Sequence, residues 1–200
     1  MLVEIYIDDV VVKSRDFIKH LADPRKMCTR KHGLKMNPNK YAFGVSAGQF
    51  LGFIVHQRGI EMSRRSIDAI NKVVAPANNT ELQSLIGNIN FILRFISNLS
   101  GKIQAFSPLL KLKSDQEFVW GTEQQLALYE IKRYLVKTPV LVPPQHEKPF
   151  RLYLSTDDTA ISSALIQEFK GKERVIYYLS KRLVDAETRY SGIEKLCLCL

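Results

Sequence analysis

Long apolar runs and cysteines are both scarce in this chain of 200 residues. No segment approaches the roughly 18 to 20 consecutive apolar residues that a membrane-spanning helix needs, which excludes the transmembrane class. The three cysteines, Cys28, Cys197 and Cys199, support neither a disulfide framework nor a four-ligand zinc site, and we interpret them as small buried apolar residues. The first residues also lack the basic segment and apolar core of a signal peptide. We therefore expect an intracellular protein, in the cytoplasm or the nucleus, that is not secreted.

The rest of the composition is that of an ordinary globular protein. Hydrophobic residues make up 46% of the chain and charged residues 24%. At about 100 to 150 residues per domain, this length favours two small domains over one large one.

Positive charge is in excess and lies mainly in the first third of the chain. The net charge is +9, and residues 1–75 alone contain 13 Lys or Arg against 7 Asp or Glu. The basic residues between positions 10 and 40 are Lys13, Arg15, Lys19, Arg25, Lys26, Arg30, Lys31, Lys35 and Lys40. This density is typical of surfaces that contact nucleic-acid phosphates, although a solvated helix face would look the same.

The first 62 residues alternate between strand and helix patterns. Residues 2–7 and 10–14 are β-branched runs on either side of Asp8 and Asp9, which predicts a hairpin with the acidic pair as its two-residue turn. A helix is expected over about residues 16–32. Two strands, at 50–55 and around 60–62, should follow.

Helix patterns dominate the middle third, and strand patterns dominate the last. Thr80 with Gln83 and Thr122 with Gln125 fit the capping box and predict two helix starts. Apolar residues at helical spacing follow the first of them, namely Leu82, Leu85, Ile86, Ile89, Leu93 and Ile96. The proline-rich stretch 139–149 is the best domain boundary. Beyond it we expect strands at 150–155, 160–168 and 174–180 and a helix from about 190.

Two adjacent carboxylates at a hairpin tip suit Mg²⁺, which proteins usually hold with one or two carboxylates plus substrate phosphates and water. Two such ions can drive nucleotide addition, one activating the attacking oxygen and the other stabilising the leaving pyrophosphate. The dipeptide alone is weak evidence, because Asp157 and Asp158 form a second pair in the same chain.

The context of the first pair carries a close resemblance. Residues 6–9 (YIDD) between β-branched strands resemble the palm motif of reverse transcriptases, and the flanking residues resemble those of Ty3/Gypsy-type long-terminal-repeat retrotransposons. Residues 33–40 (GLKMNPNK) and 50–55 (FLGFIV) are similar to the segment after that motif and to the primer-grip hairpin. Later segments resemble the thumb (82–87 and 94–96), the connection (118–120 and 135–141) and the start of the ribonuclease H domain (150–200).

This resemblance implies an α+β fold: a partial palm with β-hairpins, a helical thumb and connection, and a truncated RNase H-like sheet with one helix. The implied domains are 1–62 (C-terminal part of the palm with the primer grip), 63–149 (thumb and connection) and 150–200 (incomplete RNase H-like domain). The chain would then be a fragment of a longer polyprotein.

The resemblance also assigns a polymerase site. Asp8 and Asp9 would be the catalytic carboxylates that bind the metal, and Tyr6 would lie near the primer terminus; the alternative is an ordinary turn with a core tyrosine. The residues implied to contact primer or template are Tyr6, Phe50, Leu51, Gly52, Phe53, Lys35, Lys40 and Arg94.

The RNase H-like portion departs from the family pattern. Ser155 stands where the strand aspartate belongs, and Leu196 where the helix glutamate belongs. Asp157, Asp158 and Glu194 are nearby but weak candidates, and a turn role is favoured for the two aspartates. We therefore hypothesise a non-catalytic RNase H-like fold.

The implied activity of the parent enzyme is RNA-directed DNA polymerisation by two-metal nucleotidyl transfer, with an attached ribonuclease H. Its cofactor would be Mg²⁺ or Mn²⁺. Two alternatives stay open for these 200 residues alone: they bind the ion, or they bind none. Its partners would be an RNA/DNA template-primer and deoxynucleotides, and no membrane. Polymerases of this family use a third palm aspartate and fingers, so the isolated chain is expected to be inactive. The alternatives are a non-catalytic basic nucleic-acid-binding remnant and a degraded gene product.

Overall fold

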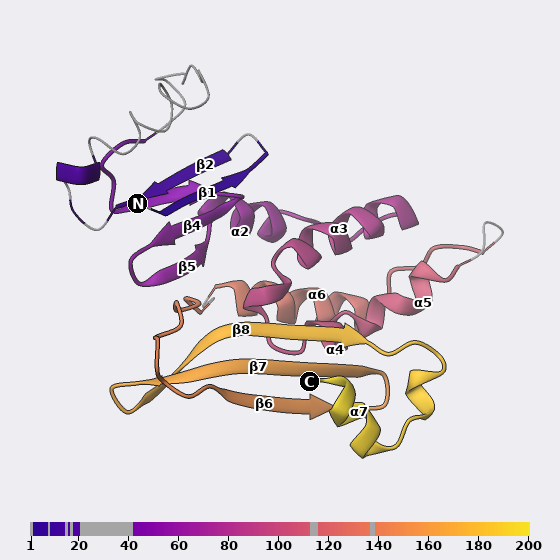
Figure 1. Cartoon of the computed structure of the whole chain (residues 1–200). Coiled ribbons are helices and arrows are strands. Elements are labelled where there is room, and N and C mark those ends of the chain that lie inside the picture. Colours follow the sequence, from indigo (N-terminus) through magenta and orange to yellow (C-terminus); the bar gives the residue numbers. More distant parts are fainter. Residues whose placement is uncertain are drawn as a thin grey trace. The chain divides into compact units, whose positions relative to one another are not determined.

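The computed structural model describes residues 2–7, 9–14, 16, 18–20, 42–112, 116–136 and 139–200 (Figure 1). The chain divides into two compact units, Met1–Gln57 and Arg58–Leu200, which are described separately below.

An antiparallel hairpin begins the first unit. Strand β1 (Leu2–Tyr6) pairs with β2 (Asp9–Lys13), and Tyr6 lies opposite Asp9. This register sets Ile5 opposite Val10, and β-branched cross-strand pairs of this kind stabilise a hairpin. Asp9 therefore begins β2, and Ile7, with φ of 50°, occupies the turn. The prediction that Asp8 and Asp9 together form the turn was wrong.

The expected helix over 16–32 is described only at its start. Residues 18–20 are helical, and the amide N–H of His20 donates to the carbonyl oxygen of Asp16 at 2.9 Å. The Asp16 side chain accepts the Ile18 N–H at 3.0 Å, as a helix-capping residue does. The remainder of that predicted helix, with Cys28, lies outside the described residues.

A second hairpin occupies residues 47–56. Strand β3 (Ala47–Phe50) pairs with β4 (Phe53–His56), and Phe50 lies opposite Phe53. Leu51 (φ 51°) and Gly52 (φ 78°) both have left-handed backbones, as the two central residues of a type I′ turn do. The prediction of one continuous strand over 50–55 was wrong, because this turn reverses the chain inside the apolar run.

The second unit begins with β5 and continues into a helical layer. Its elements are β5 (Gly59–Met62), α2 (Arg64–Asn71), α3 (Asn79–Phe91), η2 (Leu93–Phe95), α4 (Leu99–Lys102), η3 (Gln104–Phe106), α5 (Ser107–Leu110) and α6 (Thr122–Leu135). The predicted stripe of α3 is confirmed, since Leu82, Leu85 and Ile89 are almost fully buried. They join a core with Ile92, Phe95, Ile96, Leu99, Phe106, Leu128, Ile131 and Leu135.

Both predicted helix caps are displaced. The Asn78 side chain accepts the Glu81 N–H at 2.9 Å, and the Glu81 carboxylate accepts the Ala77 N–H at 2.8 Å, so Asn78 rather than Thr80 caps α3. Helix α6 is capped at Gly121, whose N–H donates to Oε1 of Gln124 at 3.1 Å. The Asn78–Glu81 pair comes before the Thr80–Gln83 pair in the sequence. It therefore accepts the backbone N–H groups that the start of the helix leaves without a partner.

A three-stranded antiparallel sheet and a short helix complete the second unit. The strands are β6 (Arg151–Thr156), β7 (Ala160–Phe169) and β8 (Lys172–Arg182), in that order across the sheet, followed by η4 (Glu187–Arg189) and α7 (Gly192–Leu198). Helix α4 packs against β7 and β8 (Figure 1), where the Ser100 N–H donates to Ser180 Oγ at 2.9 Å. The predicted strands and C-terminal helix are confirmed, as is the α+β class.

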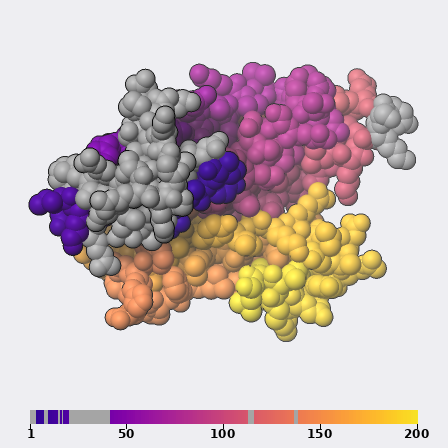
Figure 2. Space-filling model, turned by 45° about the horizontal axis from the view of Figure 1, so that its top comes forward, coloured from indigo at the N-terminus to yellow at the C-terminus, as the bar shows by residue number. Residues whose placement is uncertain are grey.

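Helix α7 packs against β6 and β7. Cys199 is buried with Ile161 and Leu183, with Leu154 packed against them. The outer side of α7, yellow in Figure 2, is exposed, and Ile193 there exposes 75% of its surface. Cys197 is exposed as well, so the prediction of a buried residue was wrong at that position.

The proline-rich stretch leads from α6 to β6 in the chain, and it forms hydrogen bonds with both β5 and β8. Ile60 and Leu141 exchange two backbone hydrogen bonds of 2.9 and 3.0 Å, and the Val142 N–H donates to the Val175 oxygen of β8 at 3.0 Å. Gly59 is buried against Leu141. Among the described residues, no helix is long and apolar enough to cross a membrane.

Candidate functional site

The β1–β2 hairpin presents the predicted polymerase site at its tip. Tyr6, the last residue of β1, exposes 55% of its surface and is therefore not a core tyrosine. Asp9 is its direct cross-strand partner. Asp8 and the side chain of Asp9 lie outside the described residues. The backbone thus brings Tyr6 and Asp9 together.

Carboxylate oxygens on a hairpin tip fit the donor chemistry of Mg²⁺ or Mn²⁺, because these hard cations need only one or two protein carboxylates beside substrate phosphates and water. Across the described part of the chain, no three His, Cys, Asp or Glu side chains form a cluster able to hold a metal.

The second hairpin of the first unit carries the predicted primer-grip residues. Phe50 is half-buried and Phe53 is 7% exposed, so the two cross-strand phenylalanines support the hairpin. The tip residues Leu51 and Gly52 are at the surface, and Leu51 exposes 36% of its area. Of the four, Leu51 is the most exposed and Phe53 is buried.

The remaining predicted template contacts are separate from these hairpins in the chain. Arg94 lies in η2 of the second unit and is half-buried. Lys35 and Lys40 lie outside the described residues, as do the positions between 21 and 41 that carry most of the basic segment.

The RNase H-like portion brings its strand and helix together at Ser155. Ser155 lies in β6 opposite Ser162, and its carbonyl oxygen is 3.8 Å from Sγ of Cys199, just after α7. Leu196 lies on α7 and exposes 37% of its surface. The two positions that the family pattern gives to carboxylates thus hold a hydroxyl and an apolar side chain.

The three nearby carboxylates already have local roles. Asp157 Oδ1 accepts the N–H groups of Thr159 at 2.8 Å and Ala160 at 2.7 Å, which forms the turn between β6 and β7. Burial alone would raise the pKa of Asp157, but these hydrogen bonds, with the charge of Lys195, lower it overall. Glu194 accepts the Ser191 N–H at 2.7 Å and caps α7.

Asp158 is exposed, and only its backbone oxygen is engaged, by Lys195 Nζ at 3.5 Å. The residues present here therefore do not fit the metal-binding set of a ribonuclease H.

Sequence reasoning missed a second group of cations. Lys148, Lys170, Lys172 and Arg174 line one depression with Gln145 and Phe169. The net charge of residues 151–200 is only +1, which concealed this group. The available signal was the two-residue spacing of Lys172 and Arg174, which puts them on one face of a strand, but the strand was expected to begin only at residue 174.

The C-terminal part of the chain matches a known domain family. Residues 120–200 match the family described as the RNase H-like domain found in reverse transcriptase. This part of the chain is similar to the RNase H-like domains of reverse transcriptases.

Its relatives are polyproteins of transposable elements. The chain is 30% identical to the retrovirus-related Pol polyprotein from transposon opus of Drosophila melanogaster and 27% identical to the transposon Tf2-3 polyprotein of Schizosaccharomyces pombe, over 98% of its length in both cases. It covers 21% and 15% of those polyproteins, respectively. The resemblance to a segment of a retrotransposon polyprotein is confirmed.

Solved structures show the same fold. A foamy viral protease-reverse transcriptase in complex with an RNA/DNA hybrid matches with a TM-score of 0.82 and 24% identity, over 98% of this chain and 27% of that one. The foamy viral protease-reverse transcriptase dRH in complex with double-stranded DNA matches with a TM-score of 0.83 and 25% identity, over 98% of this chain and 35% of that one. The predicted reverse-transcriptase architecture is thus confirmed at the level of the fold.

Proposed function

We propose that this chain is a working part of an RNA-directed DNA polymerase in which Asp8 and Asp9 bind the catalytic metal. The observation that carries the proposal is the β1–β2 register, which brings Asp9 opposite the exposed Tyr6 at the tip of the hairpin. The 98% coverage by transposon polyproteins supports it.

The proposed template-primer partner follows from nucleic-acid complexes of the foamy viral relatives. Deoxynucleotides are the second proposed substrate. The chain spans about a fifth or less of the transposon polyproteins, so polymerisation is proposed for the longer protein.

The chain's own residues would hold and orient the reactants. Asp8 and Asp9 would hold Mg²⁺ or Mn²⁺, and bound ions of this kind would supply activation of the primer hydroxyl and stabilisation of the pyrophosphate. The exposed ring of Tyr6 is available to pack beside the primer terminus. At the other hairpin, Gly52 has no side chain to keep a phosphate from the backbone, which suits a primer grip.

For the RNase H-like portion we propose the absence of catalysis. Asp157 is occupied by a turn, Glu194 by a helix cap, and Ser155 replaces a carboxylate. A two-metal cleavage needs several carboxylates directed at one point. We expect no metal-dependent cleavage of an RNA/DNA hybrid by this chain.

A second candidate is a nucleic-acid-binding module without chemistry. It is favoured by the four cations Lys148, Lys170, Lys172 and Arg174, which line one depression. In that case the chain binds template-primer and Mn²⁺ binding to the hairpin is absent. A gene product with no role would bind neither.

The test compares the two acidic pairs of the chain. Mn²⁺ broadens nearby NMR signals, and we expect it to broaden the amides of Tyr6 and Ile7 in the wild type but not in the D8N/D9N variant. The D157N/D158N variant removes the same charge from a turn and should broaden like the wild type. Broadening that survives in D8N/D9N would overturn the proposed metal site.

A primer-extension assay with Mg²⁺ or Mn²⁺ completes the test. We expect the isolated chain to bind a template-primer and not to extend it, because polymerisation is proposed for the longer protein, of which the chain spans about a fifth or less. Extension that D8N/D9N abolishes would contradict the expected inactivity and would establish the catalytic role of the pair.

A further inference from the structure

The far end of the β7–β8 hairpin carries a group of cations on one face of the sheet. The turn residues Lys170 and Gly171 have φ of 51° and 74°, and the register sets Phe169 opposite Lys172 and Gln167 opposite Arg174. Side chains alternate between the faces of a strand, so Lys172 and Arg174 lie on the same face as Phe169 and Gln167.

A loop of the proline-rich connection is fixed against this face. The Gln167 side chain is fully buried and accepts the Gln145 N–H at 2.8 Å. Its Nε2 donates to the carbonyl oxygens of Gln145 at 3.0 Å and Lys148 at 2.9 Å. With these three bonds, one buried amide holds residues 145–148 in place, and Lys148 Nζ lies 5.8 Å from the centre of the Phe169 ring.

The result is a preformed depression lined by cations. Its volume is about 420 Å³, and its lining residues are Gln145, Lys148, Phe169, Lys170, Lys172 and Arg174. Within the described part of the chain, no ion pair engages any of its four cations. We call these six residues the hairpin basic site.

The neighbouring carboxylates are engaged elsewhere. Glu168 and Glu173 alternate with the lining residues and therefore lie on the opposite face, where Arg151 binds them at 2.9 and 2.8 Å. The hydrogen bond from Arg151, with that from Tyr153, lowers the pKa of Glu173 and keeps it ionised in this cluster. The sheet thus separates its charges by face.

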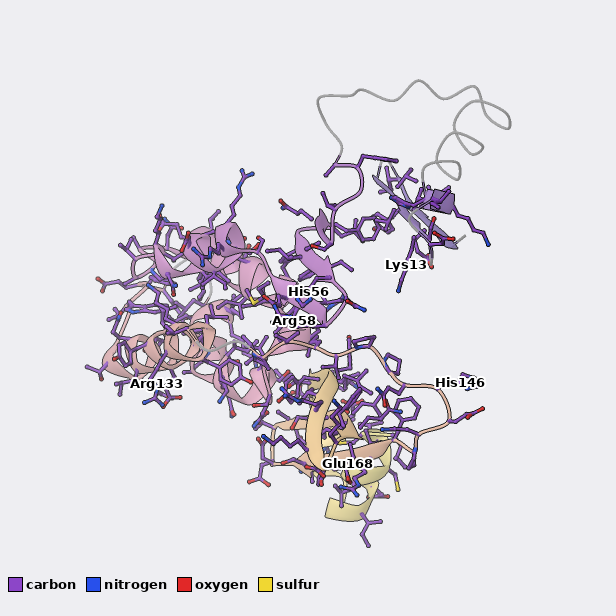
Figure 3. All side chains as sticks on the ribbon, turned by 90° about the vertical axis from the view of Figure 1, so that its left-hand side faces the viewer. Lys13, His56, Arg58, Arg133, His146 and Glu168 are labelled. Carbon is purple, nitrogen blue, oxygen red and sulfur yellow. The ribbon has the colours of Figure 1, made fainter. Side chains whose placement is uncertain are left out.

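The loop itself carries one acid and one histidine. Glu147 pairs with His146 at 3.6 Å, both side chains are at least 87% exposed, and neither lines the depression. Figure 3 shows His146 pointing away from the sheet that carries Glu168. No acidic group therefore neutralises the four cations from within the site.

We propose that the hairpin basic site binds the phosphodiester backbone of a nucleic-acid duplex. Unpaired Lys and Arg side chains around an open depression suit phosphate oxygens, which accept hydrogen bonds from both. A duplex is favoured over an anionic lipid surface because the single aromatic ring of the site is half-buried under Lys148 and cannot insert into a bilayer. This inference rests on the proposed function, and it adds a contact remote in sequence from residues 10–40.

The test measures affinity for a 20-base-pair RNA/DNA hybrid as a function of salt. The K170Q/K172Q/R174Q variant removes three cations of the site; the control K111Q/R133Q/R189Q removes three exposed cations outside it. We expect the site variant to bind about tenfold more weakly, with a slope of log affinity against log salt that is smaller by about 2.7. The control should change both quantities much less. The K170R/K172R variant should bind like the wild type.

Each other result overturns the inference. A site variant that keeps the wild-type affinity and the wild-type salt dependence would overturn the inference and leave the proposed function intact. Equal losses of affinity in the two triple variants would show that net charge alone causes the effect. A wild-type chain that does not bind the hybrid would overturn the nucleic-acid part of the proposed function as well.

Two further measurements keep the result unambiguous. Binding to phosphatidylserine vesicles that depends on these cations, without binding to the hybrid, would assign the site to membranes instead. Circular dichroism confirms that each variant is folded.

Discussion

Ser191 and Glu194 bind each other's backbone amides at the start of α7: the Glu194 carboxylate accepts the Ser191 N–H at 2.7 Å, and Ser191 Oγ accepts the Glu194 N–H at 3.4 Å. This capping box occupies the acidic side chain nearest to the position of the expected helix carboxylate. We expect S191A to lower the free energy of unfolding by about 1 kcal/mol. Urea titration measures it, and an unchanged midpoint would contradict the cap.

The same carboxylate predicts a dependence on pH. The hydrogen bonds from Ser191 lower the pKa of Glu194, so its stabilising contribution is present above the ordinary glutamate pKa of about 4.3 and is lost as the pH falls through the lowered value. E194Q retains the cap and does not titrate. The wild type should therefore lose more stability than E194Q between pH 7 and pH 3. Equal losses in urea titrations at the two pH values would refute the prediction.

Asp157 should behave as a turn residue and not as a metal ligand. Its Oδ1 accepts two backbone N–H groups and the Thr159 hydroxyl at 3.1 Å. We expect D157A to destabilise the chain by about 1 kcal/mol in urea, while D158A, whose side chain is exposed, changes stability by less than about 0.5 kcal/mol. If Mg²⁺ raised the melting temperature of the wild type but not of D157A, Asp157 would be a ligand.

Gln167 should contribute to the stability of the fold, although its side chain carries no charge. Q167L leaves the Gln145 N–H and two loop carbonyls without their partner, which should cost about 1 to 3 kcal/mol in thermal or urea unfolding. Q145A is the matched control, because Gln145 makes these bonds with its backbone alone. A Q167L variant as stable as Q145A would show that the loop is not held by this amide.

These cases show which parts of the molecule local sequence determines. The amphipathic stripe of α3 and the alternating runs of β6 to β8 depend on neighbours a few residues away, and both were predicted. Gln167 bonds a loop 22 residues distant, and only the folded sheet brings the two together. No periodicity encodes such a pair, so the buried amide and the basic site beside it were not predicted.

The hairpins that carry the predicted polymerase residues show a different limit to prediction from the sequence. The residue types near Asp9 predicted a hairpin, but the position of its turn depends on the cross-strand register, which pairs Asp9 with Tyr6 and begins β2 one residue earlier than predicted. Likewise, apolar residues on both sides of Gly52 masked a reversal that the left-handed backbone of Leu51 makes possible. The first hairpin was therefore predicted without its turn, and the second was predicted as a single strand over 50–55.

Leu51 is expected to be strained. A left-handed backbone costs a residue with a Cβ roughly 1 to 2 kcal/mol, so L51G should raise the free energy of unfolding by about 1 kcal/mol. Lys170 has the same φ at the equivalent position of the β7–β8 turn, and K170G should give a similar gain. If L51G binds template-primer more weakly while being more stable, the Leu51 side chain contributes to binding, as the primer-grip resemblance implies. A less stable L51G would contradict the expected strain.

Gly59 should tolerate no side chain. Its φ is 142°, and a Cβ there would overlap the carbonyl group of Leu141. We expect G59A to lose at least about 2 kcal/mol of stability or to fail to fold. The control G48A meets nothing within 4 Å and should be nearly neutral. Comparable melting temperatures for the two variants would contradict this account.

The bonds of Leu141 and Val142 have a mechanical consequence. These adjacent residues bind different strands, Leu141 to Ile60 of β5 and Val142 to Val175 of β8. One peptide unit thus couples two strands that are more than a hundred residues apart in the chain. A shift of β8 along its axis must therefore either break one of these bonds or pull β5 with it, so that load applied to the sheet is transmitted to β5.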